Sequence, residues 1–129
     1  EREALRVVAD QHGCPTASAD LAAGLLAAAG RAARDEKVWG TYHLAGTEAG
    51  TWHEFAAAIV EAAAPLTGRR PAVQPIATAD FPTRAKRPAN SRLDSTLFAR
   101  TFGFVARPWR ERVGEIVLRL QGMETGAAR

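Results

Sequence analysis

The segment at positions 10–16, with the sequence Asp-Gln-His-Gly-Cys-Pro-Thr, gathers several side chains that can bind a ligand. An apolar stretch at 5–8 precedes it, and leucine and alanine recur at helical spacing after it, so the segment is predicted to join a buried strand to a helix. Gly13 permits backbone angles closed to other residues, and Pro15 fixes one torsion, so this loop is rigid. A rigid polar loop at the end of a strand is typical of a binding site.

The same segment also admits plainer interpretations. In an ordinary strand-to-helix connection, Thr16 or Ser18 would cap the following helix. Asp10, His12 and Cys14 alternate as metal ligands sometimes do, but a structural zinc site normally takes four ligands and more cysteine, so the pattern does not favour a metal site. A catalytic pair of Cys14 and His12 lacks an identifiable third partner and an oxyanion hole.

A second segment, at 85–94, has the sequence Ala-Lys-Arg-Pro-Ala-Asn-Ser-Arg-Leu-Asp. It contains most of the one local cluster of basic residues, which runs from Arg84 to Arg92. The cluster falls in a long stretch without periodicity at 77–92, and a loop of that length inside a compact domain is usually functional or disordered. Two interpretations stay open from charge alone: a solvated loop, or a surface that contacts phosphate.

The composition predicts one globular domain. A chain of 129 residues with 47% hydrophobic residues can bury one core of ordinary size. Its single cysteine cannot form an internal disulfide, which favours a reducing compartment. No stretch approaches the roughly 18 apolar residues of a membrane span. The net charge of +3 is spread among acidic residues rather than concentrated, which argues against nucleic acid as the partner.

Strands and helices are predicted to alternate along the chain, with few strands and about four helices. Bulky residues at 38–44 favour a strand, and a shorter strand is expected at 73–76. Thr51 and Glu54 have the spacing of a capping box, so a helix is predicted to begin there.

The C-terminal part predicts two further helices. Asp94 is suited to cap the first of them, and Gly103 ends it. Pro108 opens the last helix, whose apolar stripe begins at Trp109 and reaches Leu120.

Histidine and tryptophan residues invite functional interpretations, but packing is the preferred one. His43 is expected to be a hydrogen-bonded core residue of the predicted strand, and His53 to be solvated in the first turn of a helix. Trp39, Trp52 and Trp109 are spaced as packing residues, so a core position is expected for each; stacking of one of them on a base or sugar is the alternative.

Four blocks of sequence run in order along nearly the whole chain: VVADQHGCPT with DLA, GTYHLAG with TWHEFA, PIATADFPTRAKRPANSRLD, and the closing PWRE. Together they resemble the C-terminal part of dTDP-4-dehydrorhamnose reductases, a family of extended short-chain dehydrogenase/reductases that act on nucleotide sugars. His12 and Cys14 stand where this family often has an aromatic residue and a serine, so a direct ligand contact is not carried over for those two side chains.

The resemblance implies an α/β fold, with α+β character in this chain, that forms the C-terminal substrate-binding part of a Rossmann-type NAD(P)-binding reductase. Residues 1–121 are expected to be the nucleotide-sugar-binding domain fragment, and residues 122–129 a frayed tail. The N-terminal dinucleotide-binding domain is expected to be absent, because the chain has no G-x-G-x-x-G turn and no Tyr-x-x-x-Lys pair: Gly46 stands four positions after Tyr42, the only tyrosine. The fragment alone is therefore expected to be inactive.

The resemblance further implies that the intact enzyme reduces dTDP-4-dehydro-L-rhamnose to dTDP-L-rhamnose with NADPH or NADH, in the cytoplasm, for cell-surface polysaccharide. Either Arg87 or Arg92 is the natural partner of the diphosphate. The substrate-binding residues expected from the two segments are Asp10, Gln11, Gly13, Pro15, Thr16, Arg87, Asn90, Ser91 and Arg92. No catalytic residue and no metal ligand is assigned here. A homodimer is expected, and magnesium is admitted because some members hold it near the subunit contact; neither nucleic acid nor a membrane is expected as a partner.

Two other functions remain as alternatives. A non-catalytic relative of the same fold, resembling the beta subunit of methionine adenosyltransferase, would keep the cleft and act as an interaction protein; an intact Tyr-x-x-x-Lys pair upstream would favour the reductase. A stand-alone basic module would bind nucleic acid with steep salt dependence and without preference for nucleotide sugars.

Overall fold

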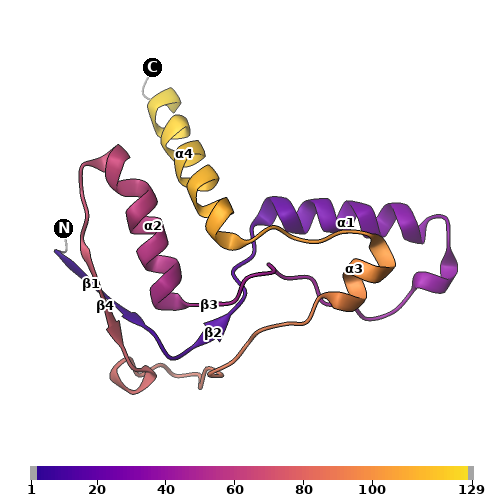
Figure 1. The fold of residues 1–129 in the computed structure, drawn as a ribbon, viewed down its shortest axis with the longest axis horizontal. Helices are drawn as coiled ribbons and strands as arrows, with labels where there is room; N and C mark the ends of the chain where they lie inside the picture. The colour runs from indigo at the N-terminus through magenta and orange to yellow at the C-terminus, as the bar shows by residue number, and fades with distance from the viewer. Residues whose placement is uncertain (1–2, 128–129) are drawn as a thin grey trace.

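The computed structural model describes residues 3–127, with side chains described as far as 122. Its elements follow in the order β1 Ala4–Val8, β2 His12–Gly13, α1 Ser18–Ala32, the 3-10 helix η1 Glu36–Val38, β3 Gly50–Thr51, α2 Trp52–Thr67, β4 Ala72–Ile76, the 3-10 helix η2 Thr78–Asp80, α3 Thr96–Phe102 and α4 Trp109–Ala127. In Figure 1 the strands β1 and β4 lie with α2 at one end of the molecule, while α1 and α3 lie at the other. The described part thus confirms the predicted α/β class.

Two small sheets organise the chain. β1 and β4 pair in parallel, with Ala4 opposite Ala72 and Val8 opposite Ile76. Parallel neighbours need a crossover connection, and α2 forms its last part and packs against both strands. β2 and β3 pair antiparallel, with His12 opposite Thr51. The strands predicted at 5–8 and 73–76 are confirmed.

One apolar cluster lies between α2 and α4, which run side by side in Figure 1. Phe55 packs edge-on against Trp109 with ring centroids 5.5 Å apart, and Trp109 is only 2% exposed. The predicted capping box starts α2: Glu54 N donates to Thr51 Oγ1 at 3.1 Å, and Thr51 N donates to Glu54 Oε2 at 2.7 Å. The apolar stripe predicted for α4 lines one groove together with Phe55 and Ile59 of α2, so it faces α2.

A second cluster joins α1 to α3. The Tyr42 ring packs edge-on against Phe102 at 4.7 Å and against Phe98 at 6.3 Å. Gly24 of α1 permits Leu44 and Phe104 to pack against that helix, because a Cβ there would lie 2.4 Å from Leu44 Cδ2 and 3.2 Å from Phe104 Cδ1. One ion pair also ties α1 to α4, since Arg112 donates from Nε to Asp20 Oδ2 at 3.0 Å and from Nη2 to Oδ1. Asp20 is 3% exposed, so this pair is shielded from solvent.

The prediction of a strand at 38–44 is wrong. Residues 36–38 form η1, and 39–44 have no strand pairing in the described structure. High strand propensity fails there because no neighbouring strand lies alongside to take the hydrogen bonds. Tyr42 instead packs into the aromatic cluster and donates its hydroxyl to Val38 O at 2.7 Å.

Two predicted caps also differ. Ala17 occupies the N-cap position of α1 and makes no side-chain cap, so neither Thr16 nor Ser18 has the predicted role. Ser95 occupies that position in α3, although Asp94 Oδ1 accepts from Thr96 N at 2.8 Å and so satisfies an amide of the first turn. The helix end at Gly103 is confirmed, with φ at 66°.

The tryptophan and histidine residues differ in how far their solvent exposure agrees with the prediction. Trp109 is in the core as predicted, but Trp39 is 75% and Trp52 is 53% exposed, so the prediction for those two is wrong. His43 is exposed rather than part of the core, because the strand that would bury it does not form. The His53 ring is half-buried, with Nε2 3.1 Å from Val73 O, rather than solvated.

The last helix is longer than predicted. α4 continues to Ala127, so residues 122–127 of the segment predicted to be a frayed tail belong to this helix, and 128–129 lie outside the described residues. Loss of apolar periodicity ends a packing stripe but not the backbone hydrogen bonds of a helix. None of the described helices is long and apolar enough to cross a membrane.

Candidate functional site

The two segments singled out in the sequence lie side by side. His12 N donates to Ala89 O at 2.8 Å, and Ser91 N donates to His12 O at 2.8 Å, which makes a parallel bridge between positions 12 and 90. Ser91 Oγ adds a second donor to the same carbonyl at 3.0 Å. β2 thus stands between β3 on one side and the 89–91 strip on the other, and it fixes the rigid loop against the basic segment.

Three adjoining clefts lie along this junction. The Arg92 cleft, about 590 Å³, is lined by Cys14, Leu44, Ala45, Gly46, Thr47, Ala49, Asn90, Arg92, Leu93, Asp94, Ser95, Thr96, Ala99, Phe104, Val105 and Ala106. The central cleft, about 350 Å³, is lined by Gln11, Gly13, Cys14, Pro15, Thr16, Gly50, Thr51, Trp52, Phe55 and Ser91. The Arg87 cleft, about 340 Å³, is lined by Arg6, Val7, Val8, Gln11, Trp52, Phe81, Thr83 and Arg87.

Shared residues connect the three clefts into one row. Cys14 lines both the Arg92 cleft and the central cleft, while Gln11 and Trp52 line both the central cleft and the Arg87 cleft. Eight of the nine predicted substrate-binding residues line this row, the exception being Asp10. A row of connected clefts suits an elongated ligand with several chemically distinct parts.

Asp10 lines none of the three clefts. Its carboxylate accepts from Thr78 N at 3.0 Å on both oxygens and from the Thr78 hydroxyl at 2.6 Å. The hydroxyl bond, followed by the backbone bond, holds the pKa of Asp10 below its ordinary value of 3.8. The Gln11 side chain, which is 7% exposed, reaches the same Thr78 Oγ1 through Nε2 at 3.1 Å.

Thr16 and Gly13 brace the loop. Thr16 Oγ1 donates to Cys14 O at 2.8 Å and accepts from Gly46 N at 3.0 Å. Gly46 must be glycine for this approach, since a Cβ would lie 2.4 Å from Pro15 O. A Cβ on Gly13 would lie 3.1 Å from Ser91 Oγ, so the two segments meet closely there.

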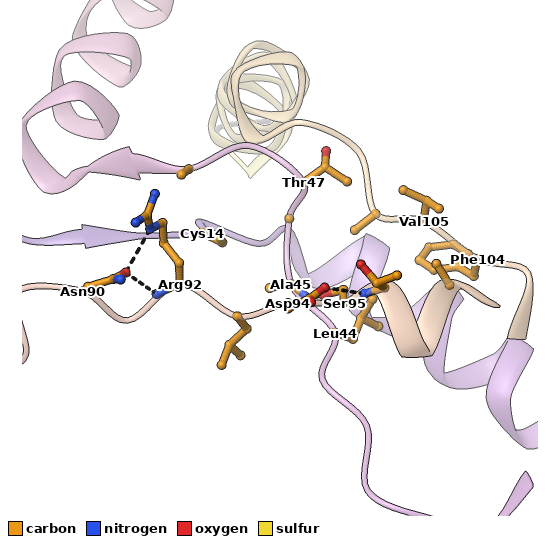
Figure 2. A pocket seen from close by; sticks show the side chains of 16 residues that line it. Cys14, Leu44, Ala45, Thr47, Asn90, Arg92, Asp94, Ser95, Phe104 and Val105 are labelled. Carbon is orange, nitrogen blue, oxygen red and sulfur yellow. Dashed lines mark hydrogen bonds between the residues drawn. The ribbon is translucent and has the colours of Figure 1, made fainter. Parts of the chain in front are cut away.

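Figure 2 shows the Arg92 cleft from close by, with Arg92 and Asn90 together at one end and Asp94 and Ser95 further along. Asn90 Oδ1 accepts from Arg92 N at 3.1 Å and from Arg92 Nε at 2.9 Å. The Asp94 carboxylate accepts hydrogen bonds from the side chain and the backbone of Thr96, at the start of α3. These bonds hold the pKa of Asp94 below its ordinary value. Ser95 Oγ accepts from Ala45 N at 3.0 Å, so this wall is hydrogen-bonded together.

Arg87 and Arg92 differ in their charge balance from three arginines at the start of α4 and just before it. Arg107, Arg110 and Arg112 each pair with at least one carboxylate. Neither Arg87 nor Arg92 has an ion pair with a carboxylate within residues 3–122, and both are exposed at the clefts that they line. An uncompensated guanidinium beside a cleft is suited to bind an anion with paired donors.

Sequence reasoning missed several residues that line the clefts. Trp52, predicted for the core, is half-exposed at the first position of α2 and borders two clefts. Its place in the first turn of a helix was the available signal, because that turn lies beside the strand that precedes it. Arg6, Phe81 and Thr83 join the Arg87 cleft through the pairing of β1 with β4, which sequence periodicity does not reveal.

Metal ligation has no support in the described part of the chain. No group of three or more His, Cys, Asp or Glu side chains there is placed to hold a metal ion. His12 and Cys14 are neighbours of the clefts without a third partner of that kind.

Comparison with solved structures defines the class of protein. The fold matches a dTDP-4-dehydrorhamnose reductase of Clostridium acetobutylicum with a TM-score of 0.77 and 36% identity, covering 93% of this chain and 40% of that one. It also matches a dTDP-4-dehydrorhamnose reductase of Bacillus anthracis, solved in complex with NADP, with a TM-score of 0.72 and 30% identity, covering 92% of this chain and 39% of that one. The chain therefore has the fold of the substrate-binding part of a Rossmann-type reductase.

The sequence then gives the family. The family of the RmlD substrate binding domain matches residues 1–121, and the chain belongs to it. A curated dTDP-4-dehydrorhamnose reductase of Sinorhizobium fredii is 37% identical over 93% of this chain and 42% of its own length. Its counterpart in Aggregatibacter actinomycetemcomitans is 42% identical over 89% of this chain and 40% of its own length. The chain thus spans about two-fifths of the length of these relatives.

Proposed function

We propose that this chain is the nucleotide-sugar-binding part of a dTDP-4-dehydrorhamnose reductase. The observation that carries the proposal is the row of clefts at the junction of positions 10–16 and 85–94. Three arginines along it, Arg6, Arg87 and Arg92, form no ion pair with a carboxylate among the described residues. The relatives that share this fold and sequence act, by their names, on dTDP-4-dehydrorhamnose. A nucleotide sugar is elongated, carries two negative phosphates and presents many hydroxyls, which matches guanidinium groups beside polar loops.

The intact protein would transfer a hydride from NADPH or NADH to the C4 keto group of dTDP-4-dehydro-L-rhamnose. This chain's residues would bind and orient the sugar nucleotide, and orientation alone contributes several kcal/mol, roughly 7–11 at best, to lowering a barrier. The Bacillus anthracis relative was solved with NADP bound. This chain has neither a Gly-rich dinucleotide turn nor a Tyr-x-x-x-Lys pair, so the cofactor site and the proton donor would come from outside residues 1–129, and this part alone would be inactive.

We infer the following roles within the site. Arg87 and Arg92 would contact the diphosphate or the groups next to it, with Asn90 holding Arg92 in place. Gln11 and Ser91 would offer hydrogen bonds to the ligand, while Gly13, Pro15 and Thr16 shape the loop. Asp10 would act through Thr78 and not by touching the ligand. The expected homodimer and cytoplasmic location stay predictions, and nothing in the described part supports magnesium.

Calorimetric titration of the intact protein with dTDP-L-rhamnose tests the proposal. Replacing Arg87 or Arg92 with alanine should weaken binding about tenfold or more, because a hydrogen bond to a charged group contributes roughly 1.5–3 kcal/mol. Arg84→Ala is the matched control, since Arg84 lies in the same basic loop but lines none of the three clefts. Absence of binding to the unaltered protein would refute the proposal. Binding without any hydride transfer would favour the non-catalytic relative.

A further inference from the structure

Residues 44–51, which we call the wall segment, border two of the three clefts in turn. The first part of the segment lines the Arg92 cleft, its last two residues line the central cleft, and Glu48 is the one member that lines neither. The residues on the Arg92 cleft are Leu44, Ala45, Gly46, Thr47 and Ala49, and those on the central cleft are Gly50 and Thr51. The shape of both clefts therefore depends on where this segment is held.

Hydrogen bonds fix both ends of the wall segment. Near its start, Ala45 N donates to Ser95 Oγ and Gly46 N donates to Thr16 Oγ1, each at 3.0 Å. At its other end, β3 pairs with β2. The backbone of positions 47–49 forms no hydrogen bond within the described part of the chain. A side chain therefore has to hold the middle of the segment.

Glu48 supplies that contact. Its Oε1 accepts a hydrogen bond from Arg110 Nε at 2.5 Å, across 62 positions of sequence. Arg110 is the second residue of α4, and its Nη2 also lies 3.8 Å from Glu54 Oε1, in the capping box of α2. Arg110 thus ties the middle of the wall segment to the first turns of both α4 and α2.

Trp109 places the Arg110 guanidinium and also supports the wall segment directly. The guanidinium carbon lies 4.3 Å from the centre of the Trp109 ring, close enough for a cation–π attraction. The Trp109 ring is buried and packs on Phe55, so it is a rigid support. A Cβ on Gly50 would lie 2.9 Å from Trp109 Cζ2, so the backbone of the wall segment lies directly on the same ring. Two neighbouring residues of α4 therefore set the position of the segment, one by charge and the other by packing.

We propose that Arg110 is a positioning residue for nucleotide-sugar binding. Through Glu48, and from its place over Trp109, it holds the wall segment where that segment can contact the ligand in both clefts. This inference rests on the proposed function and adds to it a residue that lines none of the three clefts. The side chains of Arg110 and Glu48 are 49% and 32% exposed, so we expect their pair to affect the affinity of the site more than the stability of the fold.

Kinetics and calorimetry on the intact protein test this role. Arg110→Met removes the charge but keeps a long side chain. It should raise the KM for dTDP-4-dehydro-L-rhamnose and the Kd for dTDP-L-rhamnose by about two- to fivefold, as the strength of an exposed ion pair allows. The kcat and the KM for the nicotinamide cofactor should stay unchanged, because only substrate binding is weakened. Arg110→Lys keeps a charge for Glu48 and should restore most of the affinity.

Arg107→Met is the matched control. Arg107 lies just before α4, its side chain is 44% exposed, and it pairs with Glu111 and Glu115 of α4 instead of the wall segment. This variant should bind dTDP-L-rhamnose as the unaltered protein does. Thermal unfolding should show similar, small changes for Arg107→Met and Arg110→Met, so that weaker binding in Arg110→Met alone cannot come from a general loss of stability.

Glu48→Gln measures the coupling between the two partners. Alone it should weaken binding about as much as Arg110→Met, and the two changes together should weaken it no more than Arg110→Met alone, because the residues act as one pair. Unchanged affinity in Arg110→Met, or losses that multiply in the double variant, would overturn this inference and leave the proposed function standing. Failure of the unaltered protein to bind dTDP-L-rhamnose would overturn both.

Discussion

At the scale of single residues, the site depends on side chains that hold other side chains. Asp10, predicted to touch the substrate, instead fixes Thr78 and through it Gln11. The residue types showed that this loop has polar side chains able to bind a ligand. They did not distinguish a residue that contacts the ligand from one that holds such a residue in place. The distinction depends on a partner 68 positions away, in η2, which local sequence does not indicate.

Replacing Asp10 with asparagine should lower stability near neutral pH, and the difference from the unaltered protein should vanish in acid. The pKa of Asp10 is lower in the folded protein than its ordinary value of 3.8, so the ionised carboxylate stabilises the fold above that value. This contribution is lost as the pH falls through the folded-state pKa. Urea unfolding between neutral pH and about pH 2 measures it, and a difference that persists unchanged at the acid end would contradict the role given to Asp10.

At the scale of elements, local sequence patterns correctly predicted the helix start and the helix end that are formed by hydrogen bonds between nearby residues. The capping box of α2 and the glycine end of α3 are both present, because each is completed within a few residues. The strand expected at 38–44 failed because a strand needs a neighbour, and propensity does not supply one. Trp52 was misplaced for a related reason: its position in the first turn of α2 decides its exposure, not its apolar character.

Two glycine-to-alanine changes test how the helices end and continue. Gly103 has φ at 66°, in the left-handed region, and a Cβ there would meet no atom within 4 Å, so Gly103→Ala should cost about 1 kcal/mol of unfolding free energy through backbone strain alone. Gly114 lies inside α4, also with open space, and Gly114→Ala should stabilise by roughly 0.5–1 kcal/mol. Chemical denaturation compares the two, and equal effects of the same sign would contradict these backbone assignments.

At the scale of the whole molecule, long-range contacts bring the site together. The bridge between positions 12 and 90 and the pairing of β2 with β3 join three parts of the chain. The sequence predicted that the two polar segments matter, largely through their resemblance to a family, but not that the clefts form a connected row. That row requires the register of β1 against β4 and of β2 against β3, which side-chain periodicity in short strands leaves open.

The Asp20–Arg112 pair is the main polar link between α1 and α4. Asp20→Asn should reduce the unfolding free energy by roughly 1–3 kcal/mol, since it weakens the partner of a guanidinium at a position only 3% exposed. The hydrogen bonds from Arg112 keep the pKa of Asp20 below its ordinary value, so the loss should shrink as the pH falls through that pKa. Asp35→Asn, which breaks the exposed Arg31–Asp35 pair, should change stability by about 0.5 kcal/mol or less. Thermal unfolding of both variants measures the two losses of stability. Equal losses for Asp20→Asn and Asp35→Asn would contradict the structural importance of the Asp20–Arg112 pair.

The most direct test of the proposed nucleotide-sugar site is a crystal structure of the intact protein bound to dTDP-L-rhamnose. We expect the ligand along the row of clefts, with its diphosphate against Arg87 or Arg92. A nucleotide sugar bound away from the junction of positions 10–16 and 85–94, with neither arginine in contact, would contradict that assignment.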